Sequence, residues 1–235
     1  MNIKRDVHAD LYGVDGCKAG WFVAKQCGRT GTIATKVIGR FEDLLEWKRA
    51  NAIVAVDMPI GLSSNGVRTC DTLARKILGR PRASSVFTPP IRAALVSSSY
   101  EEACAVNQAV TGKRISIQAF HIRNKIAEVD DMLRTLADED VRVFEVHPEL
   151  SFMHLRMEQG GPAHGLRESK AIASGRRARR IRGVMDRAPN RFGNDIPSAR
   201  RHRVRFGKSS HGHLLLMLAD GFVKRIRNTT ASTAV

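Results

Sequence analysis

The chain has 235 residues, a hydrophobic content of 43% and a formal net charge of +16. This length and hydrophobic content suit one large domain, which we place over residues 1–235. No apolar stretch approaches the ~20 residues of a membrane-spanning helix, and the polar start argues against a secretory signal. We therefore expect a cytoplasmic protein with no membrane partner. The four cysteines show no CxxC spacing, which argues against a zinc ribbon.

The positive charge is concentrated in the last part of the chain. Residues 1–150 hold 21 Lys and Arg against 18 Asp and Glu, whereas residues 151–235 hold 18 against 5. This asymmetry favours an anionic partner, with nucleic acid first, although a generally Arg-rich proteome would raise the charge with no binding role. The residues expected to contact nucleic acid are Arg176, Arg177, Arg179, Arg180, Arg200, Arg201, Arg203 and Arg205.

The first third of the chain shows the pattern of an α/β domain. Strands are predicted over 10–16, 20–26, 31–38 and 52–57, with a helix over 41–50 before the last of them. Three strands, a helix and a fourth strand form an α/β opening.

The rest of the chain is predicted to be mainly helical. An insertion of about 60–118 follows the fourth strand. It contains a helix over 67–79 that ends in a left-handed cap at Gly79, and then a proline-rich loop over 80–100. An apolar stripe from Phe120 to Leu136 predicts an amphipathic helix. The remaining predicted segments are a strand over 141–147, a helix that begins at Pro148, and a basic C-terminal part of about 160–235, with helices over 169–187 and 212–227 around an irregular stretch over 188–210.

Two of the predicted strands end on an aspartate, Asp15 and Asp57. If these strands are neighbours, the two carboxylates lie together at one edge of the sheet. Carboxylates are the ligands that Mg²⁺ takes from proteins. The alternative for either residue alone is a turn-forming aspartate that bonds its own backbone.

Glu145 and His147 lie on the same face of the strand predicted over 141–147, because side chains alternate along a strand. They could be metal ligands, general acid–base groups or members of a structural network. His211 and His213 have no third ligand at zinc spacing. There is also no GxxxxGK[ST] phosphate loop.

Several motifs in order resemble the domain-of-unknown-function family numbered 429, whose members are predicted nucleases of the RNase H-like fold. The matching segments are Gly13-Val14-Asp15-Gly16-Cys17-Lys18-Ala19-Gly20-Trp21, Val56-Asp57-Met58-Pro59-Ile60-Gly61-Leu62, Cys70-Asp71 with Ala74-Arg75, Ser84-Ser85-Val86-Phe87-Thr88-Pro89-Pro90-Ile91-Arg92, Gln118, Lys125-Ile126-Ala127-Glu128-Val129-Asp130 and Glu145-Val146-His147-Pro148-Glu149-Leu150-Ser151-Phe152. The resemblance implies a five-stranded sheet of order 3-2-1-4-5 flanked by helices.

The same resemblance implies a metal-dependent phosphodiesterase. Asp15 and Asp57 would hold Mg²⁺ or Mn²⁺, with Glu145 as an accessory. The other expected pocket residues are His147, Lys125, Ser84 and Ser85.

The last helix departs from the family. Members usually carry Asp-Asp-x-x-Asp-Ala there, whereas this chain has Gly212-His213-Leu214-Leu215-Leu216-Met217. His213 could touch a metal, but Leu216 cannot. The expected function is therefore a weakened or inactive nuclease. The alternatives are a nucleic-acid-binding protein without catalysis, a phosphotransfer enzyme of the actin-like class, or an enzyme that acts on a small metabolite.

Overall fold

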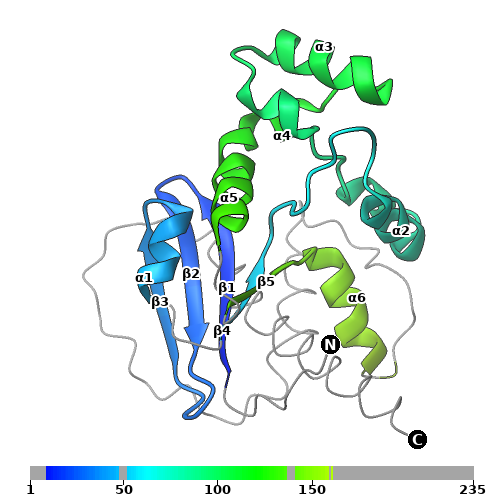
Figure 1. Cartoon of the computed structure of the whole chain (residues 1–235). Coiled ribbons are helices and arrows are strands. Elements are labelled where there is room, and N and C mark those ends of the chain that lie inside the picture. The colour runs from blue at the N-terminus through cyan, green and yellow to red at the C-terminus, as the bar shows by residue number, and fades with distance from the viewer. Residues whose placement is uncertain (1–8, 48–51, 137–140, 159, 161–235) are drawn as a thin grey trace, which may run out of the picture.

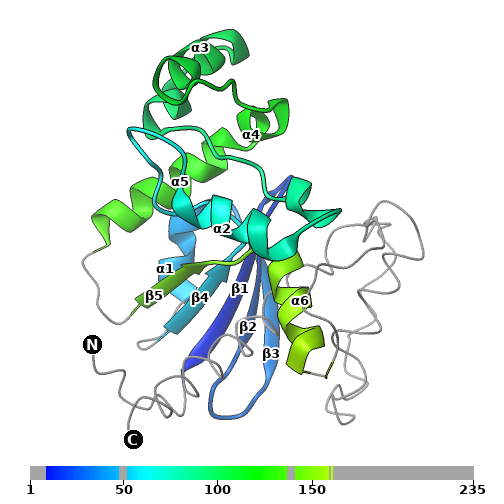
Figure 2. The same ribbon diagram turned by 90° about the vertical axis from the view of Figure 1, so that its right-hand side faces the viewer.

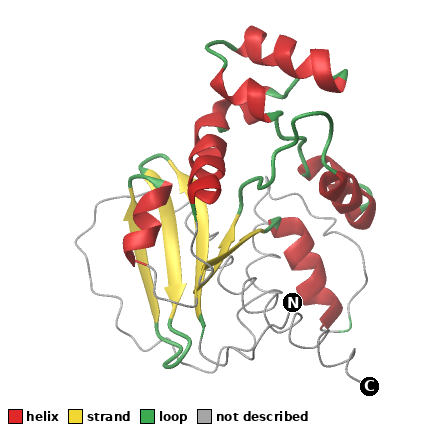
Figure 3. Ribbon diagram, in the orientation of Figure 1, coloured by secondary structure: helices red, strands yellow, loops and turns green. Residues whose placement is uncertain are grey.

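The structure is a computed structural model that describes residues 9–47, 52–136, 141–158 and 160. It contains a five-stranded mixed sheet of order β3-β2-β1-β4-β5 (Figures 1 and 3). The strands are β1 (Asp10–Cys17), β2 (Gly20–Gln26), β3 (Ile33–Ile38), β4 (Ala52–Val56) and β5 (Val141–Glu145). β2 is antiparallel to both β1 and β3, whereas β4 is parallel to β1 and β5. The predicted α/β architecture and strand order are confirmed.

The helical segments lie mostly between β4 and β5 in the sequence. They are η1 (Phe41–Asp43), α1 (Leu44–Trp47), α2 (Thr69–Leu78), η2 (Arg82–Ser85), η3 (Arg92–Val96), α3 (Tyr100–Thr111), α4 (Ile117–His121), α5 (Arg123–Thr135) and α6 (Pro148–Glu158). Within the described ranges, none of these helices combines the length and the apolar character needed to cross a bilayer.

The sheet has a hydrophobic core on each face, because successive side chains of a strand point to opposite sides. Tyr12 and Val14 of β1 are fully buried on the face that α1 and α5 cover. Leu11 and Ile53 belong to the second core, with Phe152 of α6. Figure 2 shows α6 on the opposite side of the sheet from α1 and α5. The ends of β1 and β4, which carry Asp15 and Asp57, lie between these two helical layers.

The segment between β4 and α5 forms a helical lobe, which we call the insertion lobe (α2 to α4, residues 69–121). It projects beyond the end of the sheet at which β1 and β4 finish (Figure 1). The sequence predicts a loop over 80–100, but η2 and η3 interrupt it, and the prediction omitted α3 and α4. Local signals explain α3: the Ser99 hydroxyl accepts a hydrogen bond from the Glu102 amide at its start, and Gly112 ends it at φ 70°.

Gly79 and Gly20 are among the glycines with backbone angles that L-residues rarely adopt. Gly79 ends α2 at φ 58° as expected, but its ψ of −173° lies outside the left-handed helical region that the sequence predicted. Gly20 begins β2 at φ 122°, and an added Cβ there would lie 2.1 Å from the Ile38 carbonyl oxygen. Gly20 is therefore required for the close approach of β2 to the end of β3.

Candidate functional site

The sheet places Asp15 and Asp57 at matching positions of two adjacent parallel strands. Val14 pairs with Val56, and the Asp57 amide donates to the Val14 carbonyl at 3.2 Å, so the pairing continues past the end of β4. Both aspartates are partly buried. Alternation puts both on the α6 side of the sheet. The two strand ends that carry the aspartates are therefore neighbours in the sheet.

Glu145 ends β5 directly opposite Val56, one position before Asp57. Because facing residues of parallel strands share a side, Glu145 is directed to the opposite side of the sheet from the two aspartates. Its Oε2 accepts hydrogen bonds from the Ile60 amide at 2.9 Å and from Arg68 at 2.7 Å, and its Oε1 accepts from Arg68 at 2.9 Å. The carboxylate that was expected as an accessory metal ligand thus holds the loop that follows β4.

Arg68 is the centre of this network and is only 8% exposed. Its guanidinium binds the Asp71 carboxylate in a fork, grips Glu145 and donates to the Ile60 carbonyl at 2.7 Å. Burial alone would lower the pKa of Arg68, but its hydrogen bonds to Glu145 and Asp71 outweigh burial and raise the pKa above its ordinary value. The network therefore ties the end of β5 and the start of α2 to the segment three residues after Asp57.

Lys125 reaches the turn between β1 and β2 from α5. Its Nζ donates to the Gly20 carbonyl at 2.7 Å and lies 4.5 Å from the centre of the Trp21 ring. Its aliphatic stem occupies space that only a glycine leaves free, since a Cβ on Gly16 would lie 2.8 Å from the Lys125 Cδ. Lys125 therefore packs against the residue that follows Asp15 and attaches α5 to the end of β1.

Two more carboxylates of α5 complete its attachment, and neither was among the predicted site residues. Glu128 accepts hydrogen bonds from the Trp21 indole at 2.8 Å and from the Phe41 amide at 3.0 Å. Asp130 forms a two-bonded pair with Arg92 of η3, at 2.7 and 2.9 Å. The sequence signal that could have identified Glu128 and Asp130 is their position beside the apolar stripe of this helix.

His147, Ser84 and Ser85 lie where β5 meets the insertion lobe. The His147 Nε2 is 3.2 Å from the Ser85 carbonyl, which can only accept, so Nε2 carries the proton in this contact. The Ser84 hydroxyl donates to the Pro81 carbonyl and the Ser85 hydroxyl to the Arg82 carbonyl. Both hydroxyls thus stabilise the η2 turn, and His147 joins that turn to the end of β5.

The described residues contain no group of three or more His, Cys, Asp and Glu side chains arranged around a common metal position. Asp15 and Asp57 remain a candidate pair of carboxylates at adjacent strand ends. Such a site fits Mg²⁺, which commonly takes one or two carboxylates and completes its octahedron with water and substrate phosphate. His213 and the predicted nucleic-acid contacts Arg176, Arg177, Arg179, Arg180, Arg200, Arg201, Arg203 and Arg205 lie outside the described residues, as do the helices predicted over 169–187 and 212–227.

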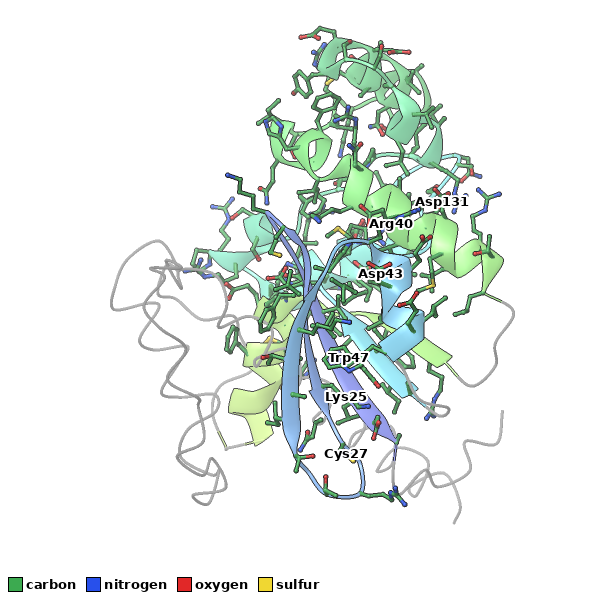
Figure 4. All side chains as sticks on the ribbon, turned by 90° about the vertical axis from the view of Figure 1, so that its left-hand side faces the viewer. Lys25, Cys27, Arg40, Asp43, Trp47 and Asp131 are labelled. Carbon is green, nitrogen blue, oxygen red and sulfur yellow. The ribbon has the colours of Figure 1, made fainter. Side chains whose placement is uncertain are left out.

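A separate depression of about 250 Å³ lies near the far end of β2, where Figure 4 labels Lys25, Cys27 and Trp47. Lys25 already pairs with Asp10 at 2.9 Å. The pKa of Cys27 is lowered, chiefly by hydrogen bonding to Thr30. This depression contains no carboxylate pair, so the acidic strand ends remain the candidate site.

Comparison with known proteins identifies one family. The model of a family described as "Protein of unknown function (DUF429)" matches residues 13–205, which include the second half of β1, both strand-end aspartates and the α5 motif. No curated protein and no solved structure matches the chain.

Proposed function

The chain belongs to the DUF429 family, and from the geometry of its strand ends we propose that it is a metal-dependent nuclease of the RNase H-like class. The observation that carries this proposal is the matched position of Asp15 and Asp57 on two parallel strands. Two carboxylates at one sheet edge suit a divalent cation that also binds a phosphate. The strand order of the RNase H-like fold supports the same assignment.

The proposed roles of the chain's own residues follow from their contacts. Asp15 and Asp57 would hold Mg²⁺ or Mn²⁺, which when bound activates water and stabilises the leaving oxygen of a phosphodiester. Arg68 and Glu145 keep the loop after Asp57 in place through the Ile60 backbone. Lys125 does the same for the turn after β1. The backbone after each aspartate is thus held by a basic side chain, Arg68 after Asp57 and Lys125 after Asp15.

Nucleic acid is the proposed substrate because of the charge of the chain. Residues 151–235 carry 18 Lys and Arg against 5 Asp and Glu. A positively charged segment raises the affinity for a polyphosphate by releasing counterions. Hydrolysis and binding would then reside in different parts of one protein.

The test is metal-dependent cleavage of labelled single-stranded and structured DNA and RNA in Mg²⁺ and in Mn²⁺. Asp15→Asn and Asp57→Asn should each abolish cleavage. They should also remove the thermal stabilisation that Mn²⁺ gives the wild type, because each replaces a charged ligand by a neutral one. Asp131→Asn is the matched control, since Asp131 is exposed on α5 (Figure 4) and makes no side-chain contact to the strand ends. Cleavage that is equal in Asp15→Asn and Asp131→Asn would refute the proposal.

A second candidate function is nucleic-acid binding without catalysis. It is favoured by the engagement of Glu145 with Arg68, which leaves two acids rather than three among the described residues at this edge. In that case the wild type binds nucleic acid with a steep salt dependence, shows no cleavage in either metal, and retains its binding in Asp15→Asn.

A further inference from the structure

Two arginines lie over two aromatic rings where the insertion lobe meets the start of α5, and we call these four residues the Arg–aromatic cluster (Tyr100, Arg114, Phe120 and Arg123). The rings of Tyr100 and Phe120 meet edge to face, with centroids 5.6 Å apart. The Arg123 guanidinium lies 3.8 Å from the Phe120 centroid, and that of Arg114 lies 5.9 Å from the Tyr100 centroid. The cluster therefore joins the start of α3 to the junction of α4 and α5.

The two arginines have no carboxylate partner among the described residues. Arg123 donates one hydrogen bond, from its Nη1 to the Phe120 carbonyl at 3.1 Å, and its Nε has no acceptor. Arg114 is exposed and contacts the Tyr100 ring. By contrast, Arg68 and Arg92 of the same region are both bound to carboxylates. The cluster thus places two arginines without a carboxylate partner in the described part of the chain over aromatic rings, Arg123 closely and Arg114 at the outer limit of a cation–π contact.

Stacking on a ring fixes the plane of a guanidinium while leaving its in-plane N–H groups available. Such a cation loses little side-chain entropy when it binds a phosphate. The guanidinium planes also suit the exposed bases of a single strand, with which arginine makes cation–π contacts. A single-stranded nucleic acid is therefore a chemically matched partner for these four side chains.

Helix α5 connects the cluster to the end of β1. Arg123 is the first residue of α5, and Lys125, two residues later, packs its stem against Gly16 at the end of β1. The same helix thus carries the cluster and contacts the residue that follows Asp15.

On these grounds we propose that the Arg–aromatic cluster contacts the phosphates and bases of the single-stranded nucleic acid that the strand-end site acts on. This inference rests on the proposed function for the identity of the substrate. The surface is distinct from the basic residues of the C-terminal part, because all four members belong to the insertion lobe or to the first turn of α5.

The experiment measures binding of a fluorescently labelled single-stranded oligonucleotide to the full chain in EDTA, as a function of salt concentration. Each phosphate contact contributes about 0.7 to the slope of log affinity against log salt for a single strand. Arg114→Gln with Arg123→Gln should therefore reduce this slope by roughly 1.4. Across an about fourfold rise in salt, the wild type should lose about sevenfold more affinity than the variant.

The control is Arg29→Gln with Lys36→Gln, which removes the same charge from exposed positions at the β2–β3 connection and on β3. Its slope should match the wild type. Arg114→Lys with Arg123→Lys should keep most of the slope but lose affinity, since lysine retains the charge without the stacking plane. If the double glutamine variant melts early, the exposed Arg114→Gln alone should still reduce the slope by about 0.7. Equal slopes in the cluster variant and the Arg29/Lys36 control would overturn the proposal.

The failure of this proposal can be distinguished from the failure of the proposed function, because binding is measured without metal. Cleavage that depends on Asp15, together with an unchanged slope in the cluster variant, refutes the cluster and leaves the nuclease. A reduced slope in a protein that cleaves nothing supports the cluster as a binding surface and refutes the nuclease.

Discussion

Replacing Arg68 by methionine removes the cation that Asp71 and Glu145 share. The Arg68 and Asp71 side chains are 6% and 5% exposed, whereas Glu145 is 32% exposed. Removing one partner of a buried pair costs about 3–5 kcal/mol, whereas the more exposed Glu145 bond adds only about 1 kcal/mol because solvent screens it. We expect Arg68→Met to lower the free energy of unfolding by about 4 kcal/mol and the melting temperature by roughly 10 °C.

Urea unfolding followed by tryptophan fluorescence measures this change, since Trp21 is fully buried beside α5. Arg40→Met is the matched control: the Arg40–Glu42 pair has a similar length of 3.0 Å, but its side chains are 70% and 53% exposed. The control should change stability by less than about 1 kcal/mol. Adding Asp71→Leu to Arg68→Met should recover at least about 2 kcal/mol, because the uncompensated buried charge is gone. A cost for Arg68→Met within 1 kcal/mol of the control would refute the burial argument.

Two further predictions concern backbone space and thiol chemistry. Gly20→Ala should destabilise the fold by more than about 3 kcal/mol, because the new Cβ would lie 2.1 and 2.6 Å from backbone oxygens. Gly16→Ala should cost only about 1–2 kcal/mol, because its close contact is with a movable lysine side chain. Urea unfolding compares the two variants, and equal losses of stability would contradict the geometry. Iodoacetamide labelling across a pH series, read by mass spectrometry, should modify Cys27 at a lower pH than Cys70. Hydrogen bonding to Thr30 lowers the pKa of the Cys27 thiol, while desolvation raises that of Cys70; labelling in the opposite order would show that these contacts do not control the two thiols.

The sheet was largely predictable from sequence because its signals are local. Apolar and β-branched runs place β1, β2 and β4 within a residue or two of their observed limits. The resemblance supplied the strand order. The prediction failed at α3, where Ser99 and Gly112 mark both ends but the neighbouring serines and prolines indicated a loop. The helix-capping residues were visible in the sequence, but the segment was wrongly interpreted as a loop.

The roles of individual polar residues were less predictable because their partners are distant in sequence. Alternation grouped Glu145 with His147, yet β5 ends at Glu145, and the two side chains contact different partners. No local pattern indicates that Arg68 lies beside Glu145, which is 77 positions later. The same holds for Lys125 and Gly20, which are 105 positions apart.

The sequence by itself determined that two acidic strand ends exist and that the chain is strongly basic, since both depend only on residue type and short-range periodicity. The tertiary structure alone decided which carboxylates lie together. Parallel pairing of β1 with β4 brings the strand ends of Asp15 and Asp57 together, while Glu145 at the end of β5 is bonded to Arg68. A shift of one residue in a strand moves a side chain to the opposite face. For that reason, the set of acids available at the candidate site depends on register, which only the assembled sheet defines.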